Sequence, residues 1–167
     1  MIDAHDRQYL ARAVELAEAG LEAGDDPFGS LLVSEAGEVL FEDHNHVAGG
    51  DATRHPELAI ARWAAGHLSP LERAAATVYT SGEHCPMCTA AHAWVGLGRI
   101  VYASSSAQLV RWLDEFGVPA PPVNPLPIAD VAPGISTDGP DRELAPRVRE
   151  LHRRKHDGRI GPAPTDA

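Results

Sequence analysis

Residues 77–88 read TVYTSGEHCPMC, and this stretch predicts a strand that leads through a loop into a helix. The β-branched and aromatic residues of 77–80 favour a strand, and residues 81–84 favour a loop. Pro86 stands where a helix tolerates proline, in its first turn, so we expect a helix over 86–97 capped by Gly98. Cys85 and Cys88, three residues apart at that helix start, are then able to present both sulfur atoms to one point.

The apolar pattern around this stretch alternates between the periods of helices and strands. Helical spacing predicts helices over 6–22, 55–68 and 106–116, and short apolar runs predict strands over 28–33, 38–41 and 99–103. Strands that alternate with helices indicate an α/β layered domain with a partly parallel sheet.

The character of the chain changes beyond Gly117. Seven of the fourteen prolines fall between Pro119 and Pro140, which excludes an ordinary helix or a central strand there. We therefore expect three parts: a catalytic domain over 1–117, a proline-rich surface segment over 118–140, and a C-terminal helix and tail over 141–167. The helix is expected over 141–156, and the last ten residues are expected to lack regular structure.

The composition argues against nucleic acid and membrane partners. The formal net charge is −10 and Lys155 is the single lysine, whereas a tRNA partner would require a basic surface. A local basic patch at Arg153, Arg154 and Lys155 is more typical of a solvated last helical turn. The N-terminus is acidic, unlike a signal peptide, and no apolar run reaches the ~20 residues that span a bilayer. We expect a soluble, cytoplasmic protein.

His55, Cys85 and Cys88 form a ligand set that suits catalytic Zn²⁺. Such a zinc commonly takes three protein ligands and leaves its fourth position for water. The helix start favours the thiolate form of the cysteines, and two cysteines are too few for a disulfide framework. Glu57 lies two residues after His55. It would take a proton from the zinc-bound water and pass it to a ring nitrogen, so that hydroxide replaces an exocyclic amine as ammonia.

Other interpretations of the same residues stay open at this stage. A closed structural zinc site would need a fourth ligand, which His84, His92 or His46 would supply. The cysteines alone would also suit a redox pair, but that function leaves His55 unexplained. A catalytically silent, zinc-stabilised binding module is the main alternative from another functional class, and Glu57 is the residue that distinguishes it from an enzyme.

His-x-Glu followed about thirty residues later by Cys-x-x-Cys resembles the signature of the cytidine deaminase superfamily. Residues 27–29 (PFG), Asn45 before 51–53 (DAT), and 80–88 (TSGEHCPMC) are similar to bacterial guanine deaminases and tRNA adenosine deaminases. The resemblance covers roughly residues 5–116. It implies a three-layer α/β/α sandwich around a five-stranded mixed sheet, and a homodimer, in some relatives with the C-terminal tail of one subunit covering the partner's site.

The resemblance also implies residues that bind the substrate. Asn45 would hydrogen-bond the base, Trp94 would stack near it, and Phe28 would line the pocket. Asparagine is also common in polar loops, and Trp94 would equally suit a core position. Asp114 is a further candidate, as a second carboxylate for an edge of the base, although exposed acids at helix ends are routine.

Three departures from the family pattern bear on the substrate. His84 stands where relatives usually have proline. Pro56 stands where many relatives have alanine, and because proline has no backbone N–H, that group is missing at position 56. The proline-rich stretch replaces the usual final strand and helix. Because the chain is acidic and offers no basic groove, we expect deamination of a small aminated nucleobase or related heterocycle, a guanine-like purine, cytosine or a triazine. Nucleoside or tRNA adenosine deamination is the alternative.

Overall fold

A five-stranded mixed sheet, with strand order β2-β1-β3-β4-β5, forms the centre of the computed structural model, which describes residues 1–157. β1 pairs antiparallel with both β2 and β3, and β4 pairs parallel with both β3 and β5. The strands are β1 (Gly29–Val33), β2 (Val39–His44), β3 (Thr77–Gly82), β4 (Arg99–Ser104) and β5 (Thr137–Asp138). The predicted tail over 158–167 lies outside the described residues.

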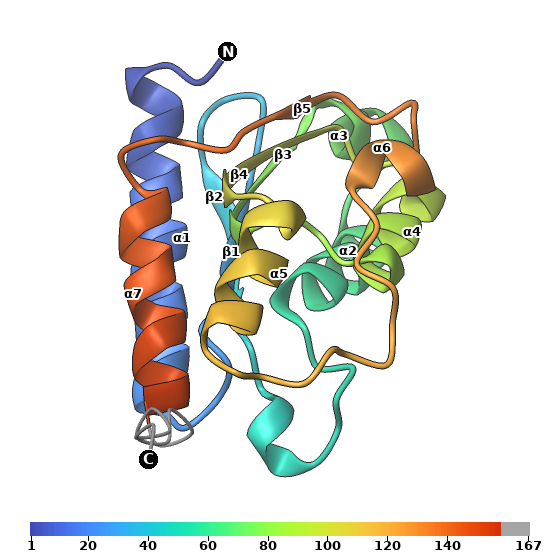
Figure 1. Cartoon of the computed structure of the whole chain (residues 1–167). Coiled ribbons are helices and arrows are strands. Elements are labelled where there is room, and N and C mark those ends of the chain that lie inside the picture. The colour runs from blue at the N-terminus through green and yellow to red at the C-terminus, as the bar shows by residue number, and fades with distance from the viewer. Residues whose placement is uncertain (158–167) are drawn as a thin grey trace, which may run out of the picture.

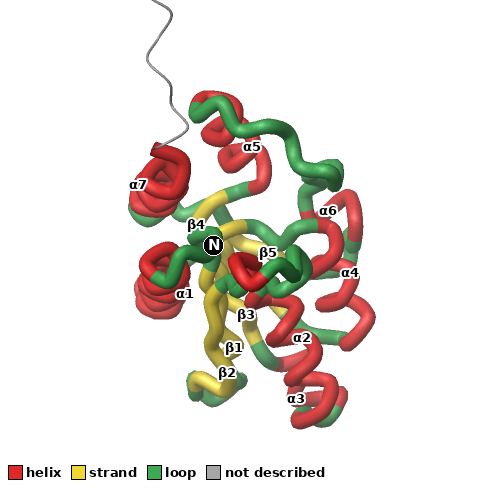
Figure 2. Tube along the Cα trace, turned by 90° about the horizontal axis from the view of Figure 1, so that it is seen from below, coloured by secondary structure: helices red, strands yellow, loops and turns green. Residues whose placement is uncertain are grey.

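Helices cover both faces of this sheet. α1, α5 and α7 pack on one face and α2 and α4 on the other, as Figures 1 and 2 show from two directions. The predicted three-layer α/β/α sandwich is therefore confirmed. The helices are α1 (Ala4–Glu22), η1 (Val47–Gly49, a 3-10 turn), α2 (Pro56–His67), α3 (Pro70–Ala75), α4 (Pro86–Val95), α5 (Ser106–Glu115), α6 (Ile128–Val131) and α7 (Ala145–His156).

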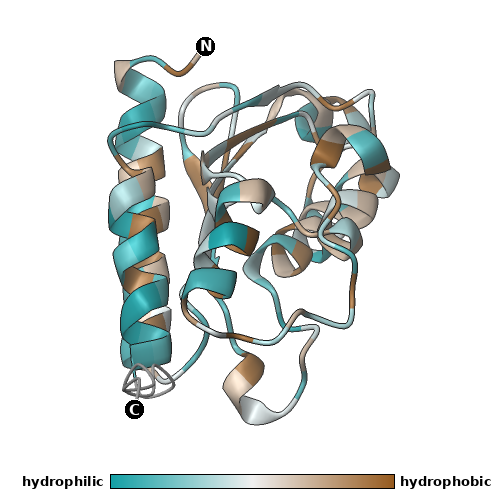
Figure 3. Ribbon diagram, in the orientation of Figure 1, coloured by the Kyte–Doolittle hydropathy of each residue, from teal (hydrophilic) through white to brown (hydrophobic). Residues whose placement is uncertain are grey.

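The alternation of side chains along each strand divides the apolar residues between two cores. Leu31 and Val33 pack with the helices α1, α5 and α7, whereas Leu32 packs with α2 and α4. All five residues of β1 are buried, because this strand has a helical layer on each side. Figure 3 shows apolar residues along the central strands and a largely hydrophilic surface on α7.

The proline-rich segment corrects one expectation. It does not replace the final strand and helix, because β5 lies within it and pairs parallel with β4, and α7 follows. β5 has only two residues and lies at the sheet edge. Prolines are tolerated beside an edge strand, because their missing N–H groups are not needed to pair with a further strand. The rest of 118–140 is loop apart from the single turn of α6.

The cap of the helix after Cys85 is also different from the prediction. α4 ends at Val95, and Gly96 forms the left-handed C-cap with a φ of 71°. Gly98 serves packing instead: a Cβ atom there would collide with the backbone carbonyls of Ala74 and Ala76. Ala74 lies in α3 and Ala76 is the C-cap of that helix, which was not predicted from the sequence.

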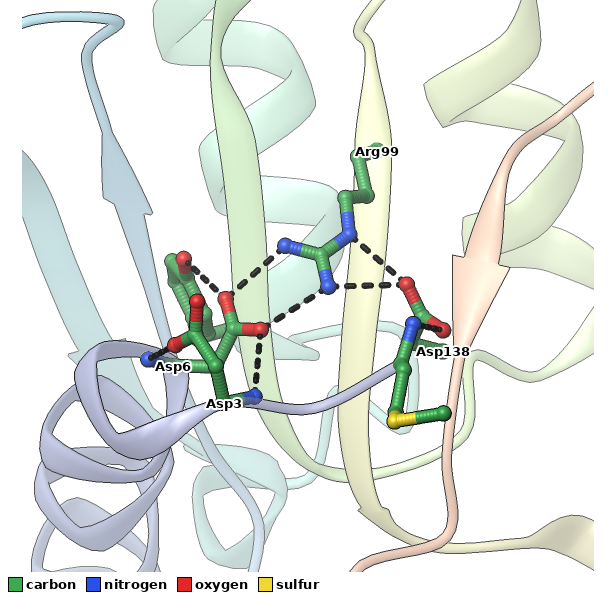
Figure 4. A network of polar contacts seen from close by, with 6 residues as sticks. Asp3, Asp6, Arg99 and Asp138 are labelled. Carbon is green, nitrogen blue, oxygen red and sulfur yellow. Dashed lines mark hydrogen bonds and ion pairs between the residues drawn. The ribbon is translucent and has the colours of Figure 1, made fainter.

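A network of polar contacts joins the N-terminus to the sheet (Figure 4). The Arg99 guanidinium donates to both carboxylate oxygens of Asp6, at 2.8 and 2.9 Å, and to Asp138 of β5. Burial alone would raise the pKa of Asp6, but hydrogen bonds from Arg99 and Tyr79 outweigh it and lower the pKa to about 2. The network therefore fixes α1 and the short β5 to the start of β4.

Ion pairs also hold α7 against α1. Arg147 and Arg154 both pair with Glu18, at 3.0 and 2.9 Å. Lys155 donates to the backbone carbonyls of Gly24 and Asp25. The C-terminal basic cluster thus contacts acceptors of the same chain.

No helix within residues 1–157 is long and apolar enough to cross a membrane.

Candidate metal centre and active site

Two helix starts bring the three predicted ligands together. His55 is the N-cap of α2, Cys85 is the N-cap of α4, and Cys88 lies in the first turn of α4. The Nδ1 atom of His55 lies 3.6 Å from the sulfur atom of each cysteine. Tetrahedral zinc, with Zn–S of about 2.3 Å and Zn–N of about 2.0 Å, would separate sulfur and nitrogen by about 3.5 Å. The three side chains therefore fit a zinc ion.

The local sequence explains why these atoms converge. Pro56 and Pro86 occupy the first helical positions, where no backbone N–H is required. β3 ends at Gly82, and the loop that follows is fixed by Glu83. Its carboxylate accepts the backbone N–H of Ser106 at 2.8 Å and that of Ile128 at 2.9 Å. The loop that carries Cys85 is thereby anchored to the starts of α5 and α6.

The electrostatics of the cluster favour a thiolate at Cys85. Hydrogen bonds from Cys88 and His55 outweigh burial and lower the pKa of Cys85 to about 4, which favours the thiolate that binds metals. The same contact with Cys85 raises the pKa of His55. The His55 ring also hydrogen-bonds to the backbone of Ala52, an outer contact of the kind that orients metal-binding histidines.

Glu57 lies in the first turn of α2 and is 5% exposed. Its Oε1 atom accepts hydrogen bonds from the hydroxyls of Ser30 at 2.8 Å and Thr80 at 3.0 Å. The carboxylate also lies beside the thiol of Cys88. Burial raises the pKa of Glu57, which brings the carboxyl group closer to the range where it exchanges protons at neutral pH.

Sequence reasoning missed Ser30 and Thr80. They lie directly opposite each other on β1 and β3, and both are fully buried. Ser30 is the one polar side chain of β1, which was the available signal, whereas β3 also carries Thr77 and Ser81. Two buried hydroxyls need partners, and here they share one carboxylate oxygen.

Two of the predicted substrate residues lie together. The backbone N–H of Asn45 donates to the carbonyl of Phe28 at 3.0 Å, which joins the end of β2 to the start of β1. Asn45 is buried, and its side-chain oxygen accepts the backbone N–H of Val47. That bond occupies the amide oxygen and leaves the amide N–H groups as donors. The Phe28 ring packs edge-on against His152 of α7.

The other two predicted substrate residues lie on the surface. Trp94, on α4, is 89% exposed, which excludes the core position considered for it. It lies six residues beyond Cys88, about 9 Å along the helix axis. Asp114 is exposed in the last turn of α5. Their roles in binding a base stay predictions.

The structure does not provide the fourth ligand of a closed zinc site among the described residues. The cluster contains only His55, Cys85 and Cys88. His84 packs edge-on against His92, and the latter bonds the carbonyl of Gly98. His46 bonds Asp43 instead. The cluster therefore has the three protein ligands of a catalytic site.

An open pocket adjoins His55 and is lined by residues of α2 and of the loop before it. Its lining is polar and carries both charges, with Asp43, Asp51, Arg54 and Arg62 among its residues. The two arginines of this pocket, Arg54 and Arg62, are exposed. Arg99, by contrast, forms ion pairs with Asp6 and Asp138.

Comparison with known proteins points to one family. The family model described as "Cytidine and deoxycytidylate deaminase zinc-binding region" matches residues 3–104. A probable cytosine deaminase of Schizosaccharomyces pombe is 31% identical over 67% of this chain and 68% of its own length. The guanine deaminase of Bacillus subtilis is 37% identical over 58% of this chain, and the match spans 62% of that relative.

The fold of this chain is similar to that of solved deaminases. A guanine deaminase from Nitrosomonas europaea superposes with a TM-score of 0.70 and 20% identity, over 94% of this chain and 86% of that chain. Structural neighbours with TM-scores of 0.69 were solved in complex with the nucleobase analogues 2,6-diaminopurine and 8-azaguanine. At this identity, the likeness supports the fold alone.

Proposed function

Because the chain belongs to the zinc-binding family of cytidine and deoxycytidylate deaminases, we propose that it deaminates a free aminated nucleobase by hydrolysis. The product would carry an oxygen in place of the exocyclic amine, and ammonia would leave. The chain spans about two thirds of the length of its curated relatives. Their substrates, guanine and cytosine, are therefore candidates for this chain.

The position of Glu57 beside the ligand set is the observation that supports a reaction best. When bound, zinc lowers the pKa of a water molecule to about 7 and so supplies a nucleophile. Glu57 is held by Ser30 and Thr80 through one oxygen, which fixes the carboxyl group against rotation. It would accept one proton of the attacking water and deliver it to the ring nitrogen. It would then take the proton of the newly added hydroxyl and pass it to the amine, so that the C–N bond breaks, the C=O bond forms and ammonia leaves.

A small base suits this chain better than RNA. The net charge is −10, and the C-terminal cations pair within the chain, for example Arg154 with Glu18. RNA binding would require a basic surface to release counterions. The amide donors of Asn45, next to Phe28, would bind an acceptor on the edge of a flat base. Nucleoside and tRNA deamination are the alternatives that the assay must test.

Ammonia release from a panel of substrates tests the proposal. Guanine, cytosine, a triazine, the matching nucleosides and a tRNA anticodon stem-loop are each incubated with the zinc-loaded protein. We expect one of the free bases to react fastest. Turnover of the stem-loop alone would contradict the free-base proposal, and turnover of nucleosides alone would move the substrate to that class.

Glu57→Gln separates an enzyme from a silent zinc-binding module. This variant keeps the size of the side chain but cannot accept the proton, so we expect zinc to stay bound and turnover to be abolished. Glu35→Gln, at an exposed turn, is the matched control and should behave like the parent. Unchanged turnover in Glu57→Gln would refute the mechanism, and absence of turnover in the parent would favour the binding module.

We also propose that the protein acts as a homodimer. The support on this chain is Trp94, a large apolar side chain that is 89% exposed. Tryptophan is enriched in the buried centres of protein–protein interfaces relative to the rest of the surface. Sedimentation of the parent and of Trp94→Ser tests this: a parent that sediments as a monomer would contradict the proposal.

A further inference from the structure

A second cluster of metal-binding side chains lies outside the site described above. Asp25 comes from the loop between α1 and β1, His44 ends β2, and His46 precedes η1. One ligand atom from each of the three lies within 4.8 Å of the others. None of these residues belongs to the His55 cluster, although His46 was considered above as a fourth ligand there.

Each of the three side chains is already oriented by an outer hydrogen bond. Nδ1 of His44 bonds the backbone carbonyl of Asn45, and Nε2 of His46 bonds the carboxylate of Asp43, both at 2.8 Å. One oxygen of Asp25 accepts the backbone N–H of Ala48 at 2.7 Å. Metal-binding histidines usually make such a contact through the ring nitrogen that does not bind the metal.

The outer contacts leave one ligand atom free on each side chain. Within residues 1–157 no hydrogen bond reaches Nε2 of His44, Nδ1 of His46 or Oδ2 of Asp25. The fully buried polar atoms that lack partners in this range do not include these atoms, so solvent reaches them. A tautomer with its proton on the bonded nitrogen gives each free ring nitrogen a lone pair.

The arrangement of the rings and the charge both suit a cation. The ring centroids of His44 and His46 lie 4.3 Å apart. Two imidazoles bound at about 2.1 Å to an octahedral cation, at a right angle, would have centroids about 4.6 Å apart. Asp25 is 6% exposed, and no lysine, arginine or histidine in the described part of the chain forms an ion pair with its carboxylate.

We propose that Asp25, His44 and His46 form a second metal site, which takes a divalent transition-metal cation such as Zn²⁺. Imidazole and carboxylate ligands favour this class of ion over Ca²⁺ or Mg²⁺, which prefer oxygen alone. The cation would join Asp25, in the loop after α1, to the two histidines that flank Asn45 at the end of β2. The site does not depend on the proposed function, because none of its ligands takes part in the mechanism.

Titration of the zinc-loaded protein with Co²⁺ tests the site. The starting material carries one zinc per chain, and binding is followed by calorimetry and visible absorbance. We expect one further equivalent to bind and to show the d–d bands of a cobalt ion with nitrogen and oxygen ligands. No thiolate-to-cobalt charge-transfer band should accompany it, because the site contains no cysteine.

Variants identify the ligands. The double variant His44→Ala/His46→Ala should bind no second equivalent. Asp43→Asn, which changes the group that orients His46 and also accepts the backbone N–H of His44, should weaken Co²⁺ binding by roughly tenfold to a hundredfold. His5→Ala, an exposed histidine at the opposite end of α1, is the matched control and should bind as the parent does.

Three outcomes would overturn the proposal. The parent would bind no further Co²⁺, or a thiolate band would appear with release of zinc and no additional equivalent bound. Alternatively, the double variant, shown to be folded by circular dichroism, would still bind the second equivalent. Because Asp43→Asn and Asp25→Asn are mild changes, they give an answer even where the double variant does not fold.

Discussion

The two hydroxyls that hold Glu57 offer a direct test of the proposed mechanism. In Ser30→Ala the Glu57 carboxylate loses a donor at 2.8 Å, while Thr80 still donates to the same oxygen at 3.0 Å. In the double variant Ser30→Ala/Thr80→Val, which keeps the shape of both side chains closely, the buried oxygen keeps neither hydroxyl. The carboxyl group then loses both contacts that fix its orientation.

The magnitude follows from the strength of these bonds. A hydrogen bond to a charged group contributes about 1.5–3 kcal/mol, and each 1.4 kcal/mol corresponds to about a tenfold change in rate. Because the Thr80 hydroxyl still donates to Glu57 and partly holds its orientation, we expect kcat to fall by about tenfold in Ser30→Ala. In the double variant we expect a fall of roughly a hundredfold or more. KM should change little, since neither hydroxyl is expected to contact the substrate.

Steady-state kinetics on the substrate found by the panel, with zinc content measured for each variant, provide the assay. Thr77→Val is the matched control, because it makes the same change on the same strand at a side chain outside the Glu57 contacts. A double variant that keeps its zinc and its fold, and also keeps the parental kcat, would refute the idea that these hydroxyls position Glu57.

Four further predictions concern the metal, pH and the substrate. Cys88→Ser should lower the zinc content and abolish ammonia release, as measured by metal analysis beside the activity assay; full zinc occupancy would contradict the ligand set. Burial lowers the pKa of His152 to about 3 from 6.5, so the folded state disfavours protonation and loses stability as the pH falls below 6.5. The loss should reach about 3 kcal/mol at pH 4, and His152→Leu should flatten this slope in denaturant titrations. Asp6 has the opposite sign of charge: its pKa of about 2 stabilises the fold above pH 4, and this contribution is lost as the pH falls to 2. Asp6→Asn should therefore lower the free energy of unfolding at pH 7 by about 1–2 kcal/mol, screened by the solvent around Arg99, and have little effect at pH 2. Pro56→Ala restores a backbone N–H at the site and should change the ratio of kcat/KM between guanine and cytosine; an unchanged ratio would show that this amide does not select the base.

Most of the fold could be predicted because its elements carry local signals. The helices that begin at Pro56 and Pro86 have a starting residue and helical spacing, and both begin where the sequence placed them. β5 could not be found in this way. Its two residues, Thr137 and Asp138, form a strand only because β4 presents an unpaired edge and Arg99 bonds Asp138 across it. A strand that depends on a distant partner leaves no pattern in its own sequence.

The same distinction applies to the site. His55, Cys85 and Cys88 were predictable from spacing within two short segments, since each segment begins a helix. Ser30 and Thr80 are fifty residues apart, and the register between β1 and β3 brings them together. No local pattern encodes that register. Ser30 is distinguished by its polar character within apolar β1, but Thr80 has polar neighbours in β3 and carries no such signal.

The two departures from the family pattern near the metal ligands, His84 and Pro56, differ in how they would influence the choice of substrate. His84 is 1% exposed and its ring packs against His92, so it influences the site through the packing behind α4. Pro56 lies between His55 and Glu57, at the first position of α2, and is itself buried. This position therefore lacks a backbone N–H between a metal ligand and the residue proposed to move protons. A substrate that would pair an acceptor with that N–H would bind less well here, and a substrate with an apolar edge would lose nothing. We therefore expect Pro56→Ala to change the preference between bases more than a substitution at His84.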